Sequence, residues 1–278
     1  MLWQCRHRTI DLARPAVMGI LNVTPDSFSD GGRYVEVEAA LERARQMAEQ
    51  GAAVIDVGGE STRPGSLGVD AATECRRVVP IIERIAATLD VAISVDTSKL
   101  EVMKAATEAG ACIVNDIRAL RAAGAKEWAA GARVGVCLMH MQGEPSTMQE
   151  HPDYHDTVGE VCSFLAAQRA ACLEAGIAHE AIVLDPGLGF GKRHEHNLAL
   201  LKHLTHVAAL GSPLLVGASR KSLIGWVLGR PSAERLYGGL GIAALAVSLG
   251  ARVIRTHDVA PTLDAIGMVS AVLEGRID

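Results

Sequence analysis

The sequence predicts an α/β protein, and within that class a single (β/α)8 TIM barrel with an N-terminal hairpin covering the barrel bottom. Short apolar segments alternate with longer amphipathic segments eight times along the 278 residues, a repeat typical of strand–helix units. The short segments show no clean polar alternation, as expected of parallel strands buried on both faces. A doubly wound sheet usually has about five or six strands, so eight units favour a closed barrel.

The predicted strands share a length of four to eight residues, and most are rich in Val and Ile. Segments this short are too short for most helices. They are residues 16–23, 53–58, 92–96, 112–117, 134–140, 182–185, 214–218 and 251–256.

The predicted helices follow the strands and carry apolar residues at helical spacing. The first, residues 37–50, stops at Gly51, a residue that commonly ends helices. The others are residues 73–89, 100–109, 124–130, 156–175, 197–209, 233–249 and 262–274, with an extra helix predicted from Ser219 to Leu228. No linker or low-complexity segment interrupts the pattern, so we expect one domain over residues 1–278.

The composition limits which binding partners and which cellular compartment we expect for the protein. Hydrophobic residues make up 49% of the chain, aromatic residues only 3%, and the net charge is −5. No basic block stands out, so nucleic acid is not expected as the main partner. No apolar run reaches the roughly 18–20 residues of a membrane span, and the N-terminus lacks a signal-peptide stretch. The six cysteines form no C-x-x-C pair, which is typical of a reducing compartment, and we expect a cytoplasmic protein without membrane contact.

Polar side chains occur at the C-terminal end of nearly every predicted strand. In a (β/α)8 barrel these ends meet at one mouth, where active sites lie. A single strand-end Asp is equally well explained as a helix cap, but eight positions in succession are not. The strand-end residues are Asn22, Asp56 with Glu60, Asp96, Asn115, His140, Asp185, Ser219 with Arg220 and Lys221, and Arg255 with His257.

The types of these residues indicate what the mouth binds. Carboxylates and an amide in a recess match a flat heterocycle with N–H donors along one edge. The cations Lys221, Arg255 and His257 follow strands seven and eight, where barrels often hold phosphate. An alternative is that Lys221 and Arg255 form salt bridges to Asp96 or Asp185, and the two roles are compatible.

Two loops at the predicted mouth are rich in turn residues and are candidate lids. Residues 24–32 contain Phe28, which could cover a ring, and residues 58–66 contain Arg63, which could meet a carboxylate. A third glycine-rich stretch, residues 185–192, does not fit the dinucleotide-binding pattern because it is not in a first strand–helix unit.

Other chemistries have weaker support in the sequence. His194 and His196 lack the helical i, i+4 spacing of a zinc site, and we do not expect zinc. Ser219 has no evident adjacent base, which disfavours a Ser-His-Asp hydrolase. Lys221 follows a strand, which leaves a Schiff-base aldolase open.

Eight segments together resemble one enzyme family. They are residues 19–32, 56–65, 94–97, 115–116, 139–140, 185–192, 219–222 and 255–259. In this order, one at each strand end, they resemble the bacterial dihydropteroate synthases of the pterin-binding enzyme family over essentially the whole chain.

The resemblance implies a reaction that joins 7,8-dihydropterin-6-ylmethyl diphosphate to 4-aminobenzoate, giving 7,8-dihydropteroate and diphosphate in folate biosynthesis. It implies Mg2+ as cofactor, with Asn22 as the metal-facing residue, a homodimer, and sulfonamides as mimics of the second substrate. The implied catalytic residues are Lys221, Arg255, Asn22 and His257.

The resemblance also assigns the binding residues. Asp96, Asn115, Asp185 and Lys221 hold the pterin, and Arg255 stacks over its ring, while Asn22, Arg255 and His257 engage the diphosphate. The residues that frame 4-aminobenzoate or complete the substrate site are Thr62, Arg63, Pro64, Phe190, Gly217, Ser219 and Ser222. Since no strong base lies among them, we expect a dissociative reaction in which the leaving group is stabilised.

Two alternatives share part of this pattern. A pterin-binding methyltransferase that uses methyltetrahydrofolate would need the pterin residues but not the phosphate cations or the Arg63 loop. A non-catalytic pterin-binding paralogue would not need the complete set of Asn22, Arg63, Lys221 and Arg255.

Overall fold

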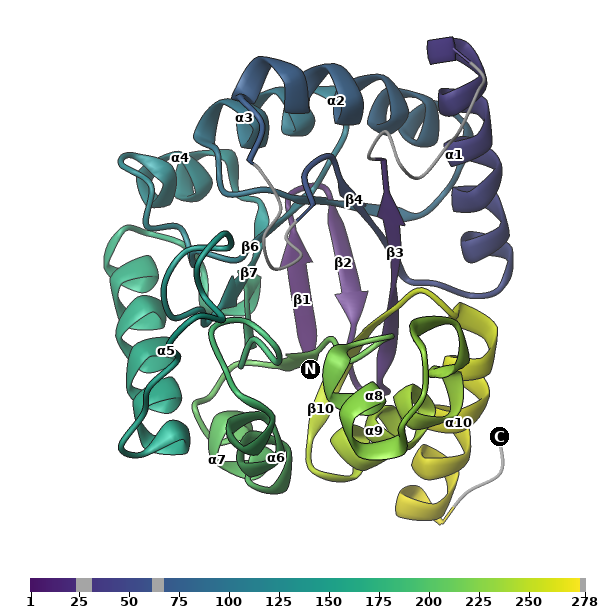
Figure 1. The fold of residues 1–278 in the computed structure, drawn as a ribbon. Helices are drawn as coiled ribbons and strands as arrows, with labels where there is room; N and C mark the ends of the chain where they lie inside the picture. Colours follow the sequence, from purple (N-terminus) through teal and green to yellow (C-terminus); the bar gives the residue numbers. More distant parts are fainter. Residues whose placement is uncertain (24–31, 62–67, 276–278) are drawn as a thin grey trace.

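A ring of parallel strands closes on itself at the centre of the molecule, and helices surround it (Figure 1). The computed structural model describes residues 1–23, 32–61 and 68–275. Within these residues eight strands form the closed barrel in the order β10-β3-β4-β5-β6-β7-β8-β9. Every predicted strand is present, and the predicted (β/α)8 barrel is confirmed.

The strands are short and buried, as their apolar sequences require. Their bounds are β3 Ala16–Asn22, β4 Val54–Gly58, β5 Ala92–Asp96, β6 Ile113–Asp116, β7 Gly135–Met139, β8 Ile182–Asp185, β9 Leu214–Val216 and β10 Ala251–Thr256.

The helices pack their apolar faces on the outside of this ring. Their bounds are α1 Gly32–Glu49, α2 Ala71–Thr88, α3 Leu100–Ala109, α4 Ala125–Ala132, α5 Thr157–Glu174, α6 His194–Lys202, α7 Leu204–Ala208, α8 Ser222–Leu228, α9 Leu236–Ser248 and α10 Val259–Glu274. In α2, the side chain of Asp70 caps the first turn by accepting from the Thr73 amide at 2.7 Å. Short 3-10 turns lie at His179–Ala181 and Ser232–Glu234.

Two helix predictions need correction. The predicted helix over residues 197–209 is two helices, because the backbone at His203 leaves the helical region with φ −115°. The predicted extra helix begins at Ser222 rather than Ser219, because Arg220 has a positive φ of 60° and cannot continue a right-handed helix.

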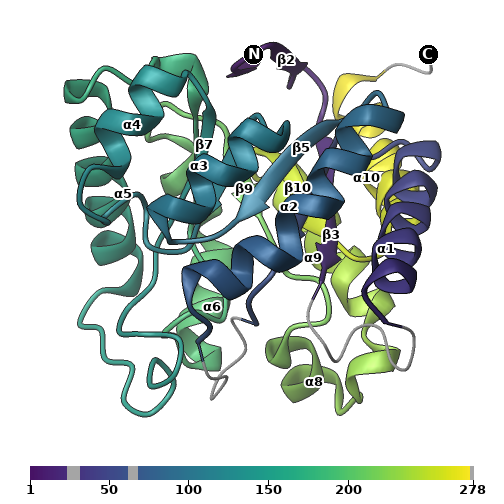
Figure 2. The ribbon, with the colours of Figure 1, turned by 90° about the horizontal axis from the view of Figure 1, so that it is seen from above.

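The predicted N-terminal hairpin closes the bottom of the barrel. Strands β1 (Leu2–Cys5) and β2 (Arg8–Asp11) pair antiparallel. Trp3 is fully buried, and its indole Nε1 donates to the carbonyl of Ala181 at 3.0 Å. Its neighbours include Val54 and Val253, which lie near the starts of their strands. Figure 2 shows β2 at one end of the molecule and α8 at the other, so the mouth is at the end remote from the hairpin.

The strand register brings several polar residues to one level of the mouth. Asn22 pairs with Gly58, Gly58 with Asp96, and Asp96 with Asn115. Neighbouring strand ends therefore present their side chains to the same space.

Among the described residues, no helix is both long enough and apolar enough to cross a membrane.

Candidate active site

An ion-pair network of one fully buried and two partly buried side chains forms the base of the mouth. Arg255 donates from Nε to Asp56 Oδ2 at 2.6 Å and from Nη2 to Asp96 Oδ2 at 2.7 Å. Asn115 Nδ2 donates to the same oxygen of Asp56 at 3.0 Å. The predicted salt bridge of Arg255 to Asp96 is confirmed, and Asp56 is a second partner. These groups come from four strands, so closure of the barrel is what assembles them.

The network shifts the protonation of its members. Burial raises the pKa of Asp96 to about 7, although the charge of Arg255 acts in the opposite direction. Burial disfavours the charged form of Arg255 and so acts to lower its pKa. The carboxylates of Asp56 and Asp96 together have the larger effect, and the pKa of Arg255 is raised. Arg255 is therefore a permanent cation between two acidic groups.

Two buried oxygens at this level lack a hydrogen-bond partner among the described residues. They are Asp56 Oδ1 and Ser94 Oγ, and Asp56 and Ser94 are register partners on β4 and β5. Buried acceptors without partners cost free energy. The base of the mouth therefore suits a ligand that brings N–H donors.

Asp185 and Lys221 form a second part of the mouth. Asp185 is buried, and its Oδ1 accepts from the amide of Gly187 at 2.7 Å. Lys221 donates from Nζ to the carbonyl of Leu188, and Nζ lies 4.3 Å from the ring centroid of Phe190. Burial lowers the pKa of Lys221 to about 8, and the charge of Asp185 limits this decrease. Burial raises the pKa of Asp185, and the Gly187 amide and Lys221 act against it.

Ser219 and His257 lie in contact at the ends of β9 and β10. Ser219 Oγ is 3.0 Å from His257 Nδ1 and accepts from the His257 amide at 3.2 Å. The prediction that Ser219 has no adjacent base is therefore wrong. Adjacent barrel strands place these two residues together, a relation that was available from the predicted strand order.

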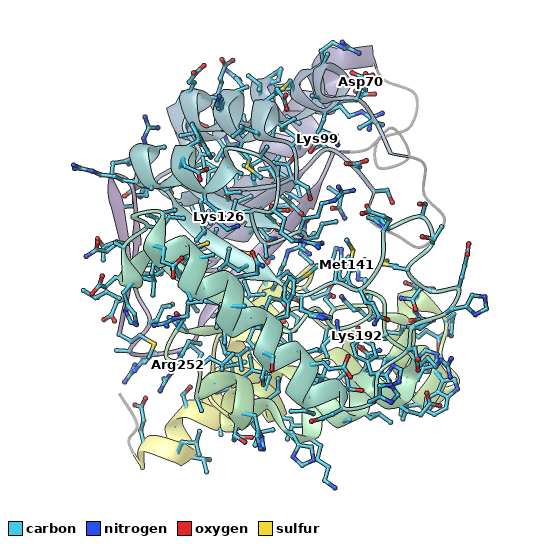
Figure 3. All side chains as sticks on the ribbon, turned by 90° about the vertical axis from the view of Figure 1, so that its left-hand side faces the viewer. Asp70, Lys99, Lys126, Met141, Lys192 and Arg252 are labelled. Atoms are coloured by element: carbon cyan, nitrogen blue, oxygen red, sulfur yellow. The ribbon has the colours of Figure 1, made fainter. Side chains whose placement is uncertain are left out.

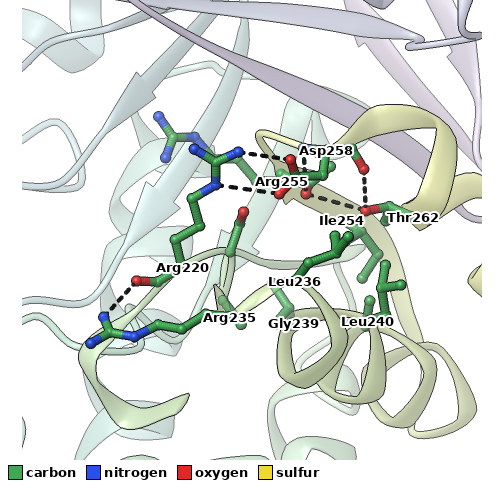
Figure 4. Close-up of a pocket in the computed structure, with 14 residues that line it drawn as sticks. Arg220, Arg235, Leu236, Gly239, Leu240, Ile254, Arg255, Asp258 and Thr262 are labelled. Carbon is green, nitrogen blue, oxygen red and sulfur yellow. Dashed lines mark hydrogen bonds and ion pairs between the residues drawn. The ribbon is translucent and has the colours of Figure 1, made fainter. Parts of the chain in front are cut away.

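The turn between Ser219 and Lys221 is fixed from outside the mouth. Arg220 forms an ion pair with Asp258 at 2.8 Å, and its carbonyl accepts from Arg235 at 3.1 Å (Figure 4). These contacts hold a residue whose φ of 60° is uncommon for a residue other than glycine. A Cβ at Gly217 would lie 3.6 Å from the Arg255 Cβ, so Gly217 lies directly against the side chain of Arg255.

Asn22 offers an oxygen to the mouth beside Asp96. A Cβ at Gly58, between them, would lie 3.6 Å from Asn22 Oδ1 and 3.8 Å from Asp96 Oδ2. No cluster of three or more His, Cys, Asp or Glu side chains that could hold a metal occurs within residues 1–23, 32–61 and 68–275. Magnesium commonly binds through one or two protein oxygens together with substrate phosphates. The donor set around Asn22 therefore fits a magnesium ion that is shared with a phosphate-bearing substrate.

Some predicted site residues are not placed with this group. Phe28, Thr62, Arg63 and Pro64 lie outside the described residues. Ser222 is placed next to the mouth: it begins α8 directly after Lys221, is exposed, and lines a small cavity together with Lys221 and Gly189.

Sequence reasoning missed two buried groups, Asp56 and Lys192, and one half-buried group, Lys99. Asp56 was recognised as a strand-end residue, but its role as the partner of Arg255 was not. Lys192, only 2% exposed, lies in the glycine-rich stretch that was discarded as a nucleotide signal. Lys99 links Glu60 and Glu74 at 2.5 and 2.6 Å. A signal for Lys192 was the close spacing of three glycines and a lysine directly after a strand.

Comparison with known proteins identifies the family. A family model described as "Pterin binding enzyme" matches residues 18–257. The dihydropteroate synthase of Escherichia coli K12 is 51% identical over 268 residues, which cover 96% of this chain and 95% of that protein.

Two solved structures have the same fold over nearly their whole length. The Yersinia pestis dihydropteroate synthase, in complex with a sulfonamide drug, has a TM-score of 0.93 at 47% identity and covers 99% of this chain and 100% of its own. The Xanthomonas albilineans enzyme with 4-aminobenzoic acid has a TM-score of 0.92 at 47% identity, covering 98% of each chain. Neither the methyltransferase alternative nor the non-catalytic one is supported by these matches. The chain belongs to the pterin-binding enzyme family and, within it, to the dihydropteroate synthases.

Proposed function

We propose that residues 1–278 act as one domain whose barrel mouth joins 7,8-dihydropterin-6-ylmethyl diphosphate to 4-aminobenzoate. One observation carries the proposal. Strand-end acceptors Asp96, Asn115 and Asp185 share the mouth with the cations Arg255 and Lys221. This pairs a recess for an N–H-bearing ring with positive charge for a diphosphate.

The pterin occupies the base of the mouth. Its N–H edge donates to Asp96 and Asp185, and the Asn115 amide completes the edge contact. A carboxylate has about four acceptor positions, so Asp96 can accept from the ring while one oxygen stays on Arg255. The guanidinium of Arg255 lies over the ring face, and Lys221 donates to a ring acceptor.

The diphosphate lies at the outer edge of the same space. Arg255 and His257 donate to its oxygens, and Asn22 would hold a magnesium ion through its side-chain oxygen. Bound magnesium would supply further neutralisation of the charge on the departing diphosphate. Side chains held in advance by the strand ends need no reorganisation as that charge develops.

The second substrate enters on the side of β8 and β9. Phe190 forms an apolar wall for the 4-aminobenzoate ring, with Gly217, Ser219 and Ser222 beside it. The family resemblance assigns Thr62, Arg63 and Pro64, which lie outside the described residues, to this site, with Arg63 as the partner of the carboxylate.

The reaction is dissociative in this proposal. The C–O bond of the methylene group breaks first, and its electron pair leaves with the diphosphate. Donation from the dihydropterin ring stabilises the cationic methylene group. The lone pair of the arylamine then forms the C–N bond, and the amine proton passes to solvent. No strong base is needed, because the arylamine is neutral near pH 7.

Diphosphate release tests the proposal. The purified chain is mixed with the pterin diphosphate, 4-aminobenzoate and Mg2+, and released diphosphate is measured with either substrate omitted as a control. Release that requires both substrates is expected. No release above the controls contradicts the proposed function, and kinetic isotope data that show strongly associative attack contradict its dissociative step.

We further propose a homodimer in which the faces of α8, α9 and α10 meet. Helix α9 contains no charged residue. Exposed apolar side chains on these helices include Trp226, Tyr237 and Met268, exposed by 55%, 82% and 67%. Such a patch favours burial against a second copy.

Free thiols at all six cysteines are compatible with a cytoplasmic location.

Sedimentation of the wild-type chain and of a Tyr237→Glu, Met268→Glu variant tests this interface. The wild type is expected to sediment as a dimer and the variant as a folded monomer. A variant that remains dimeric places the interface elsewhere.

A further inference from the structure

Lys192 is a buried lysine that the proposed mechanism does not use. Burial lowers the pKa of its ammonium group to about 7, and the charge of Asp185 limits this decrease. Its Nζ donates to the carbonyls of Gly187 and Phe190, each at 3.0 Å, within its own loop. It also reaches across to His140 at the end of β7, with Nδ1 at 2.8 Å and the carbonyl at 3.3 Å. One ammonium group therefore joins two segments of the chain. Figure 3 shows Lys192 and Met141 toward the mouth and Arg252 toward the opposite end.

The two segments that Lys192 joins lie backbone against backbone. Gly187 and Gly191 have φ of +66° and +59°. A Cβ at Gly187 would overlap the His140 carbonyl, and a Cβ at Gly191 would overlap the Gln142 carbonyl. Carbonyl oxygens that converge in a buried space repel one another unless a donor lies between them. The ammonium group of Lys192 occupies that position.

His140 is suited to accept from this ammonium. Burial lowers the pKa of His140 to about 3, and the charge of Lys192 acts in the same direction. The ring is therefore neutral near pH 7, and Nδ1 can accept because a lysine ammonium only donates. The ring also meets Phe164 edge-on at 4.9 Å.

The loop held in this way carries two groups of the mouth. The carbonyl of Leu188 accepts from Lys221 Nζ, and the centroid of the Phe190 ring lies 4.3 Å from Lys221 Nζ. Phe190 packs against a cluster that contains Met139 and Met141. The position of the Phe190 wall therefore depends on how the loop is held against β7. Asp185 lies on strand β8, so its position depends less on how the loop is held.

We propose that Lys192 is a positioning residue for the second substrate, holding the 187–191 loop against the end of β7 so that the Phe190 wall is in place before 4-aminobenzoate binds. The inference rests on the proposed function, in which Phe190 frames that substrate. A purely structural lysine would change stability and leave the substrate dependence of the folded enzyme unaltered. A positioning lysine changes KM for one substrate selectively.

The test is Lys192→Met, which keeps the length of the side chain and removes its charge. Steady-state kinetics are measured at a temperature where circular dichroism shows the variant folded. We expect KM for 4-aminobenzoate to rise roughly tenfold, as for loss of a charged hydrogen bond. Affinity for the pterin diphosphate should change by less than about threefold, because Asp96, Asn115 and Asp185 lie on strands and only the fourth pterin residue, Lys221, donates to the loop.

Lys202→Met is the matched control, since Lys202 is an exposed lysine on the following helix. It should leave both parameters unchanged. His140→Phe removes one of the four acceptors and keeps an aromatic ring, so KM for 4-aminobenzoate should rise about threefold. If Lys192→Met does not fold, His140→Phe decides the matter.

The outcomes separate this inference from the proposed function. A wild-type chain that releases no diphosphate contradicts the proposed function. An active wild type whose folded Lys192→Met and His140→Phe variants retain its KM for 4-aminobenzoate overturns the role of Lys192 alone. An equal loss for both substrates also overturns it.

Discussion

The two halves of the mouth are built in different ways. In the first half, strand register places the side chains, which are Asp56 on β4, Asp96 on β5, Asn115 on β6, Asp185 on β8 and Arg255 on β10. In the second half, Phe190 and Lys221 lie on loops and depend on left-handed turns and on buried side-chain contacts. We call these the strand-borne half and the loop-borne half.

The difference teaches where each half is vulnerable. The strand-borne half is part of the barrel core, so a change there affects folding and binding together. The loop-borne half can change position while the barrel remains intact. Substitutions in the two halves should therefore differ in how far activity and stability are coupled.

The largest effect is expected for Asp56→Asn, which breaks the strand-borne half. It removes the fully buried one of the two carboxylates that pair with Arg255. The free energy of unfolding should fall by roughly 3 kcal/mol, since an ion pair loses one buried partner. Activity should fall by at least about a hundredfold as Arg255 shifts. Urea unfolding and diphosphate release measure the two effects.

Asp90→Asn is the control, because Asp90 is 95% exposed in its ion pair with Arg8 and should change neither quantity. If Asp56→Asn retains wild-type stability, the buried network does not support the barrel.

An intermediate effect is expected for Asp185→Asn, with Arg63→Ala as its counterpart. Asp185→Asn should weaken pterin binding roughly thirtyfold, because an amide replaces a charged acceptor. It should leave KM for 4-aminobenzoate nearly unchanged. Arg63→Ala should raise KM for 4-aminobenzoate about tenfold and spare the pterin. Separate titrations with each substrate that give the opposite pattern contradict the division of the mouth.

The smallest effect is expected from a change in pH, which acts on Lys221 in the loop-borne half and on Asp96 in the strand-borne half. Burial lowers the pKa of Lys221 to about 8, with Asp185 opposing, and raises that of Asp96 to about 7, with Arg255 opposing. Above pH 8 the lysine loses its proton and cannot donate to the pterin. Below pH 7 Asp96 gains a proton and accepts less well. Pterin affinity should therefore be greatest between pH 7 and 8 and fall about tenfold by pH 9.

Lys221→Arg keeps its charge at high pH and should remove the alkaline decrease. Calorimetric titration from pH 6 to 9 measures both proteins. An alkaline decrease that persists in Lys221→Arg assigns it to another group.

Much of the strand-borne half could be predicted from the sequence. Apolar runs identified the strands, and strand ends identified Asp96, Asn115, Asp185 and Arg255 as mouth residues. The partner of Arg255 could not be found in this way, because Asp56 and Arg255 are 199 residues apart and meet through barrel closure.

The loop-borne half was harder to predict. The contacts of Lys192 follow from backbone conformations at glycines, which sequence periodicity does not report. The break at His203 and the late start of α8 were missed because each depends on one backbone conformation, at His203 and at Arg220, which periodicity does not report either. The roles of Thr62, Arg63 and Pro64 rest on the family resemblance and stay predictions.

The closing pair of β10 with β3 also has a consequence during protein synthesis. Arg255 emerges from the ribosome 199 residues after Asp56. At about 5–20 residues per second this takes roughly 10–40 s. During that time the acidic groups of β4, and later those of β5, lack their cation, and the barrel cannot close. The last strand supplies both the missing wall and the missing positive charge, so a ribosome-bound chain arrested before residue 251 should bind no pterin.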